Sequence, residues 1–236
     1  MDKVIVISGA GRGLGFSLVK QYIQLQDTIY AFDYQISNEL KALGESYKKL
    51  KYYNCDISKD NDVIESTGEI LEAGKKVDTI YNVAGFYSKE DLVSIAKTNL
   101  DLCIQMYNIN ALGALRISKS LWPLLQKGSV VVNISSEAGS IGAARRKGEY
   151  GYCMSKSAMN MFAKLLSNEL WDIGGRVINF HPGWLRTVMG GEAALKSDKS
   201  VSPDESAANI VNIVLNIDNI PRDQMYMTHT GELLSW

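Results

Sequence analysis

The sequence predicts an α/β protein with a doubly wound parallel sheet of about seven strands, covered by helices on both faces in three layers. Two observations carry this prediction. Short apolar runs rich in β-branched residues recur along the chain, and segments with helical spacing separate them. Several runs are apolar at successive positions, which is typical of strands buried on both faces. No linker, charge block or repeat divides the chain, so we expect one domain over residues 1–236.

The expected elements alternate along the chain. Strands are expected at 4–8, 28–33, 51–56, 78–85, 129–136, 176–183 and 224–229. Helices are expected at 13–26, 37–44, 60–73, 97–126, 151–172 and 204–216. Open parallel sheets bind ligands beyond the carboxyl ends of their strands, at the point where the strand order reverses. The functional residues should therefore follow directly after the strands.

The charge balance and the cysteines exclude several kinds of partner. The chain has 25 basic and 26 acidic residues, which predicts no nucleic-acid partner and no anionic membrane partner. The apolar run Val4–Ile7 is too short for a signal sequence or a membrane span, so we expect a cytoplasmic protein. Cys55, Cys103 and Cys153 form no CxxC pair, and we expect neither a metal site nor a disulfide.

A glycine-rich turn follows the first expected strand and leads into a helix. Its sequence is GAGRGLG, and such a turn lets the backbone approach a pyrophosphate while the helix presents free N–H groups to it. A turn made of permissive residues is the alternative, which the strand, turn and helix context disfavours. The residues expected to bind a dinucleotide here are Gly9, Gly11, Arg12, Gly13, Leu14 and Gly15.

Asp33 ends the second expected strand, roughly twenty residues past the glycine turn. A carboxylate at this place can accept hydrogen bonds from the hydroxyls of the adenosine ribose, and it would repel a 2′-phosphate. The sequence therefore favours NAD over NADP. NADP stays possible because Arg12 could pair with a phosphate, and an ordinary turn acid is the other interpretation of Asp33.

Six motifs in one order resemble the short-chain dehydrogenase/reductase family in its short single-domain form. They are Gly9-xxx-Gly13-x-Gly15, Asn82-Val-Ala-Gly85, Asn110, Ser136, Tyr152-xxx-Lys156 and Pro182-Gly183. The resemblance covers essentially the whole chain, and it implies a Rossmann-type fold and an NAD(P)-dependent oxidoreductase acting on CH–OH donors. The stretches HPGWLRTVMGG and GELLSW are similar to C-factor-like proteins and sniffer-type carbonyl reductases.

The resemblance also implies further cofactor contacts. Residues Asp56 and Ile57 should flank the adenine, and the turn with Asn82, Ala84 and Gly85 should line the cofactor. Val83 stands where the family often has a second asparagine. The segment around 184–200 should form a mobile flap over the substrate. The residues matching the segment that holds the nicotinamide carboxamide are Pro182, Gly183, Leu185 and Thr187.

Two tyrosines precede Lys156, and helical spacing separates their roles. Tyr152 lies four positions before Lys156 and shares a helix face with it, whereas Tyr150 lies six positions before and points to nearly the opposite side. A free tyrosine has a pKa of about 10, so acid–base work near neutral pH requires a cation that stabilises its anion. Tyr152 is therefore the candidate general acid and base, with a surface pair on a helix as the alternative.

The resemblance implies a role for each remaining candidate. Lys156 should hold the nicotinamide ribose and lower the pKa of Tyr152. Ser136 should bind and orient the substrate oxygen, with its neighbour Ser135 left open as an alternative. Asn110 matches an asparagine that distorts its helix and supports a proton relay to the lysine.

These residues together predict hydride transfer between nicotinamide and a small-molecule carbonyl or secondary alcohol. The alternative is a dinucleotide-binding signalling or regulatory protein of C-factor type with little or no turnover. The family usually associates through helices matching 97–126 and 151–172, which implies a homodimer or homotetramer. A basic insertion at 143–150 is either a solvated loop or a contact for an anionic substrate.

Overall fold

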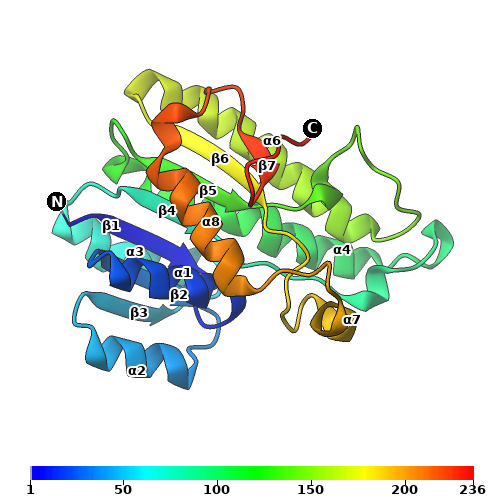
Figure 1. The fold of residues 1–236 in the computed structure, drawn as a ribbon, viewed down its shortest axis with the longest axis horizontal. Coiled ribbons are helices and arrows are strands. Elements are labelled where there is room, and N and C mark those ends of the chain that lie inside the picture. The colour runs from blue at the N-terminus through cyan, green and yellow to red at the C-terminus, as the bar shows by residue number, and fades with distance from the viewer. Residues whose placement is uncertain (1) are drawn as a thin grey trace.

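The computed structural model describes residues 2–236, and its centre is a parallel seven-stranded sheet in the order β3-β2-β1-β4-β5-β6-β7 (Figure 1). Each neighbouring pair of strands is parallel. The predicted fold class is confirmed. The strands are β1 (Val4–Ser8), β2 (Thr28–Asp33), β3 (Leu50–Asn54), β4 (Thr79–Asn82), β5 (Val130–Ile134), β6 (Arg176–His181) and β7 (Tyr226–Thr228).

Helices connect the strands and lie on both faces of the sheet (Figure 1). The helix expected over 97–126 is divided, because a π-helical turn at Asn108–Leu112 joins α4 to α5. The short helix α7 was not predicted from the sequence. No helix within residues 2–236 is long and apolar enough to cross a membrane. The helices are α1 (Gly13–Gln24), α2 (Asn38–Ser46), α3 (Asp60–Ala73), α4 (Leu100–Tyr107), α5 (Gly113–Leu121), α6 (Tyr150–Ile173), α7 (Gly191–Lys196) and α8 (Pro203–Leu215).

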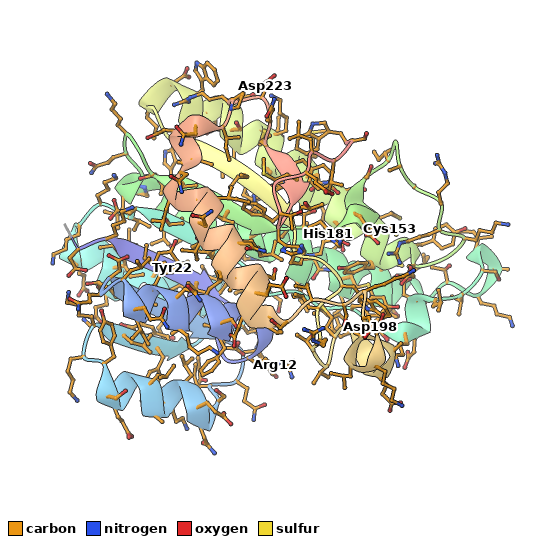
Figure 2. The ribbon with its side chains drawn as sticks, in the orientation of Figure 1. Arg12, Tyr22, Cys153, His181, Asp198 and Asp223 are labelled. Atoms are coloured by element: carbon orange, nitrogen blue, oxygen red, sulfur yellow. The ribbon has the colours of Figure 1, made fainter. Side chains whose placement is uncertain are left out.

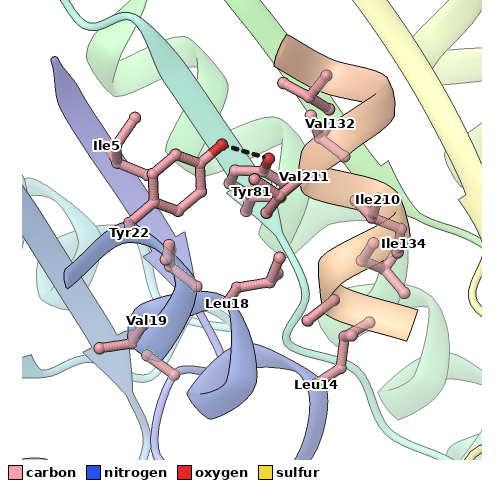
Figure 3. Close-up of a cluster of buried hydrophobic side chains, with 14 of the residues drawn as sticks. Ile5, Leu14, Leu18, Val19, Tyr22, Tyr81, Val132, Ile134, Ile210 and Val211 are labelled. Atoms are coloured by element: carbon pink, nitrogen blue, oxygen red, sulfur yellow. Dashed lines mark hydrogen bonds between the residues drawn. The ribbon is translucent and has the colours of Figure 1, made fainter. Parts of the chain in front are cut away.

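The sheet is buried on both faces, as its apolar runs predict. Successive side chains of a strand point to opposite faces, so Ile5 and Ile7 of β1 join one core while Val4 and Val6 join the other. The first core packs the sheet against α1, α2 and α8, and the second packs it against α3, α5 and α6. Figure 3 shows part of the first core, where the hydroxyls of Tyr22 and Tyr81 form a buried hydrogen bond of 2.7 Å.

The strand order reverses at β1, which pairs with β2 on one side and β4 on the other. The loops after β1 and β4 therefore meet beyond the carboxyl ends of these strands. Their approach is close: a side chain on Gly9, whose φ is +68°, would place its Cβ 2.7 Å from the backbone nitrogen of Ala84. Only glycine fits here, and this contact places the predicted cofactor turn beside the turn after β4.

Candidate active site

A cavity of ≈ 1070 Å³ lies at the carboxyl ends of the strands. It extends from the glycine turn before α1 to Tyr152 and Lys156 on α6. The structure thus brings together candidates that are up to 178 residues apart, from Gly9 to Thr187. The predicted residues that line it are Gly9, Arg12, Gly13, Leu14, Gly15, Asp33, Asp56, Ile57, Ala84, Gly85, Tyr152, Lys156, Pro182, Leu185 and Thr187.

The other predicted residues lie outside the lining of this cavity and support its walls. Gly11 donates its backbone N–H to Asp33 at 2.8 Å. Gly183, with a φ of +83°, packs against Val201 and His229. Asn82, Asn110 and Ser136 are buried side chains whose hydrogen bonds are described below.

The glycine turn presents the start of α1 to the cavity. Arg12, labelled in Figure 2, occupies the N-cap position, and no side chain caps the helix there. The first backbone N–H groups of α1 are therefore available to an anion at the cavity wall. A Cβ on Gly15 would collide with the carbonyl oxygen of Gly9, so this turn cannot carry a side chain at position 15.

Asp33 ties the end of β2 to the glycine turn. Its Oδ2 accepts a hydrogen bond from the Gly11 N–H at 2.8 Å, and its Oδ1 accepts one from the Gln35 N–H at 3.1 Å. Both bonds fix the carboxylate at the cavity wall. The negative charge there remains without a paired lysine or arginine among the ion pairs of residues 2–236.

Lys156 and Tyr152 lie together on the first turns of α6. The ammonium of Lys156 donates to the carbonyl of Ile134 at 2.8 Å and lies 5.8 Å from the centre of the Tyr152 ring. Tyr150, in contrast, does not line the cavity and is half-buried at the start of α6. Of the two tyrosines, the one that shares a helix face with Lys156 is therefore the one that lines the cavity.

Asn110 occupies the π-helical turn and joins it to the loop after β4. Its Oδ1 accepts from the Phe86 N–H at 2.6 Å, and its Nδ2 donates to the Phe86 carbonyl and to Ser155, each at 2.9 Å. A Cβ on Gly85 would lie 3.4 Å from Asn110 Oδ1 and 3.7 Å from Lys156 Nζ. The amide oxygen of Asn110 and the ammonium of Lys156 therefore both lie close to Gly85.

Burial moves the pKa values of both reactive groups. It raises the pKa of Tyr152 to about 12, while a hydrogen bond to Ser136 acts in the opposite direction. It lowers the pKa of Lys156 to about 8. Desolvation of the phenol is the largest cause of its shift, so the pKa of Tyr152 lies above its usual value and not below it, as the resemblance implied.

The two neighbouring serines have different partners. Ser135 donates its hydroxyl to Asn160 at 2.7 Å, although the residue also lines the cavity. This bond belongs to a buried ladder of amides, in which Asn82 donates to Asn133 at 2.8 Å, Asn133 to Asn179 at 3.0 Å, and Asn179 to Asn160 at 3.0 Å. The ladder crosses β4, β5 and β6 and ends on α6. Asparagines inside apolar strands were the sequence signal for it.

Ser136 belongs to a second polar network. Its hydroxyl donates to Glu137 at 2.9 Å, and Arg146 forms ion pairs with both Glu137 and Glu149. Although burial alone would raise the pKa of Glu137, the pairing with Arg146 holds it below its usual value. Glu149 also accepts a hydrogen bond of 2.8 Å from the Tyr87 hydroxyl.

This network revises the interpretation of the basic insertion. Residues 143–147 are exposed, which agrees with a solvated loop, but Arg146 is not a free cation because it pairs with two carboxylates of the same chain. Arg145 and Lys147 remain exposed. The insertion thus fastens the segment after Ser136 to the start of α6. Glu137 and Glu149 carried no telling spacing, so sequence reasoning missed them.

His181 and Cys153, both labelled in Figure 2, lie near this network. Burial lowers the pKa of His181, and the charge of Glu137 opposes that shift. Burial raises the pKa of Cys153. Across the described residues 2–236, no group of three or more His, Cys, Asp or Glu side chains is arranged to hold a metal ion.

The fold and site agree with one known family. The model of the family described as short chain dehydrogenase matches residues 3–198, and the chain belongs to this family. It is an oxidoreductase. An uncharacterized oxidoreductase of Schizosaccharomyces pombe is 30% identical over 233 residues, covering 92% of this chain and 91% of that protein.

Two further comparisons are informative. C-signal of Myxococcus xanthus is 40% identical over 98 residues, which cover 40% of this chain and 59% of that protein. The NADPH-bound carbonyl reductase from chicken fatty liver superimposes with a TM-score of 0.88 at 23% identity, covering 100% of this chain and 99% of that one. The second comparison shows that the two proteins share a fold.

Proposed function

We propose that this protein transfers a hydride between a nicotinamide dinucleotide and a carbonyl or secondary alcohol substrate. One observation carries the proposal: a single cavity joins the glycine turn before α1 to Tyr152 and Lys156 on α6. The first end suits a pyrophosphate, and the second end holds a phenol and an ammonium that can move a proton. These are the two requirements of dinucleotide-dependent carbonyl chemistry.

The residues around the cavity fit a dinucleotide. A Cβ on Gly13 would lie 3.3 Å from the Thr187 methyl group, so the missing side chain keeps a passage open between the turn and the segment after β6. The start of α1 with Arg12 would hold the pyrophosphate, and Asp33, Asp56 and Ile57 would hold the adenosine. Ala84 and Gly85 would line the middle, and the nicotinamide carboxamide would be held by Pro182, Gly183, Leu185 and Thr187.

The proposed chemistry divides among four side chains. A bound dinucleotide supplies or accepts the hydride. Tyr152 gives its phenol proton to the substrate oxygen during reduction and removes a hydroxyl proton during oxidation. Ser136 orients the same oxygen, and Lys156 holds the ribose hydroxyls and contributes positive charge. Asn110 fixes the loop after β4 beside the lysine.

Apolar side chains complete the substrate end. Phe86, Tyr87, Val188 and Met189 line the same cavity as Tyr152, and the Tyr87 ring contacts the Tyr152 ring, which favours a substrate with an apolar body. The segment 184–200, which includes α7, is proposed as the flap that closes over this substrate within one domain of 236 residues. The carbonyl reductase fold of the chicken liver protein agrees with a carbonyl substrate.

The test of this function is an assay of dinucleotide oxidation at 340 nm across ketones and aldehydes, with NADH and NADPH supplied separately. We expect turnover with at least one carbonyl class. The alternative function is that of a C-signal-like regulatory protein, which the local similarity to C-signal supports. Tight dinucleotide binding by calorimetry without turnover on any compound would favour this alternative and contradict our proposal.

We further propose that NAD is the preferred cofactor, because the Asp33 carboxylate lines the cavity without a paired cation. An Asp33→Asn variant should shift the ratio of kcat/KM values toward NADP by roughly tenfold or more. The reason is that two unit charges 4 Å apart repel by about 4 kcal/mol at an effective dielectric constant near 20. Steady-state kinetics with both cofactors measures this ratio.

Asp56→Asn is the matched control for this prediction. Asp56 also lines the cavity, but it already pairs with Lys59 at 3.4 Å and accepts from the Ser58 hydroxyl at 2.6 Å. Its substitution should change the use of both cofactors alike. A preference ratio that stays the same in Asp33→Asn would contradict the assignment.

We propose a homodimer or homotetramer that forms through α4, α5 and α6. These helices expose Ile104, Leu115, Met154, Met161 and Leu165, an apolar surface that assembly would bury. Light scattering should give a mass of two or four chains, and Leu165→Asp should lower it. Ile64→Asp on α3, at an equally exposed apolar position, should leave the mass unchanged. A mass of one chain for the protein without substitutions would exclude this assembly.

A further inference from the structure

A buried carboxylate caps the helix that carries Tyr152. Asp91 ends the short turn Lys89–Asp91 in the loop after β4, and only 2% of its surface is exposed. Its Oδ2 accepts the Tyr152 backbone N–H at 2.8 Å, and its Oδ1 accepts the Gly151 N–H at 3.1 Å. Its carbonyl oxygen accepts the Glu149 N–H at 2.8 Å. Asp91 therefore accepts three backbone N–H groups at the start of α6.

The helix has no cap from its own sequence. Glu149 occupies the N-cap position with a φ of 61°, and its side chain makes no capping hydrogen bond. The carboxylate of Glu149 binds Tyr87 and Arg146 instead. The first turn thus depends on a residue 61 positions away from Tyr152 in the chain. Hydrogen bonds from backbone N–H groups to a carboxylate are strong, and a negative charge is favourable at a helix N-terminus.

The loop that contains Asp91 also contacts the ring of Tyr152. The Tyr87 and Tyr152 rings pack edge to face, with centres 5.1 Å apart and planes at 74°. Tyr87 and Lys89 line the cavity beside Tyr152. The same loop therefore holds the backbone of Tyr152 through Asp91, holds its ring through Tyr87, and forms the wall that a substrate would touch.

We propose that Asp91 is the positioning residue for Tyr152: it sets the place of the phenol by fixing the first turn of α6 to the substrate side of the cavity. This inference deepens the proposed function and rests on it for the catalytic consequence. Asp91 does not touch the reacting atoms and acts through the main chain of Tyr152. Misplacement of a reactive group by about 1 Å can lower a rate by roughly 10²-fold.

The test compares Asp91→Ala with Asp91→Asn, which keeps one acceptor oxygen. We expect kcat to fall roughly 10²-fold in the alanine variant and less in the asparagine variant, which partly rescues the cap, while the dinucleotide Kd stays within about twofold. The amide hydrogens of Gly151 and Tyr152 should exchange faster in Asp91→Ala. The ring carbon resonance of Tyr152 in tyrosine-labelled protein should shift.

Ser37→Ala is the matched control, because Ser37 caps α2 by accepting the Leu40 N–H at 3.1 Å, at the opposite edge of the sheet. Its loss should leave kcat and the Tyr152 resonance unchanged. Unchanged amide exchange or an unshifted Tyr152 resonance in Asp91→Ala would overturn the proposal, as would an unchanged kcat. If Asp91→Ala fails to fold, Asp91→Asn gives the same three readouts. If the protein without substitutions shows no turnover on any compound, only the proposed function is contradicted. The amide exchange and the Tyr152 resonance still decide whether Asp91 positions Tyr152.

Discussion

A Tyr152→Phe variant should reduce carbonyl compounds roughly 10²–10⁴ times more slowly than the unchanged protein, the range that general acid catalysis contributes. Phenylalanine keeps the edge-to-face packing against Tyr87 and the ring beside Lys156, so the change removes only the hydroxyl, with its proton and its hydrogen bond to Ser136. Because burial raises the pKa of Tyr152 to about 12, the phenol is protonated near neutral pH, which is the form that donates to a carbonyl. Steady-state kinetics on the best substrate of the panel measures the loss in kcat.

Tyr150→Phe is the control for this change. It removes an equal hydroxyl two positions earlier, at a half-buried residue outside the cavity lining. Its kcat should stay close to that of the unchanged protein, and both variants should bind the dinucleotide with similar Kd. Full turnover by Tyr152→Phe, or equal losses in the two variants, would refute the role assigned to Tyr152.

Lys156→Met should inactivate the protein and make it more stable at pH 7. The side chain is buried, and lowering of its pKa from 10.5 to about 8 means that the charged form costs roughly 3 kcal/mol in the folded state. Methionine removes that cost but leaves the Ile134 carbonyl without its donor, which offsets part of the gain. We expect a net increase of roughly 1–3 kcal/mol in the free energy of unfolding, measured with urea.

The pH dependence of stability has a defined sign. Between about pH 8 and pH 10.5 the unfolded chain keeps a proton on Lys156 that the folded protein has lost. The free energy of unfolding therefore receives a contribution that rises with pH through this window. This contribution should be absent in Lys156→Met and retained in Lys164→Met, an exposed lysine on the same helix. Identical profiles for the unchanged protein and Lys156→Met would contradict the assigned cost.

A buried lysine that destabilises the fold is expected at a site where its positive charge is needed for the proposed reaction. Its removal should therefore raise stability and abolish the proposed activity, a trade-off that is common at active sites. The buried asparagine ladder differs from Lys156, because its polar groups are uncharged and bind one another. Its amides form hydrogen bonds with one another across β4, β5 and β6, although Asn82 Oδ1 at the end of the ladder is buried without a partner.

Much of the fold could be predicted from local patterns. The run Val4–Ser8 is fully buried as its composition indicates, and α3 has the predicted bounds of 60–73. The division of the 97–126 helix could not be predicted from periodicity, because a π-helical turn inserts one residue without changing the apolar character. The six residues of α7 are too few to show a helical period.

For the candidate site, spacing along the chain was enough to select Tyr152 over Tyr150, to place Gly9 directly after β1 and to place Asp33 at the end of β2, because helix and strand periods are local properties. The partners of Ser135, Arg146 and Asp91 depended on the assembled fold. Asp91 reaches the Tyr152 N–H across 61 residues, and Arg146 pairs with Glu137 and Glu149 from an irregular loop. No periodic pattern relates such residues, since their contacts arise from how separate loops pack together at the end of the sheet.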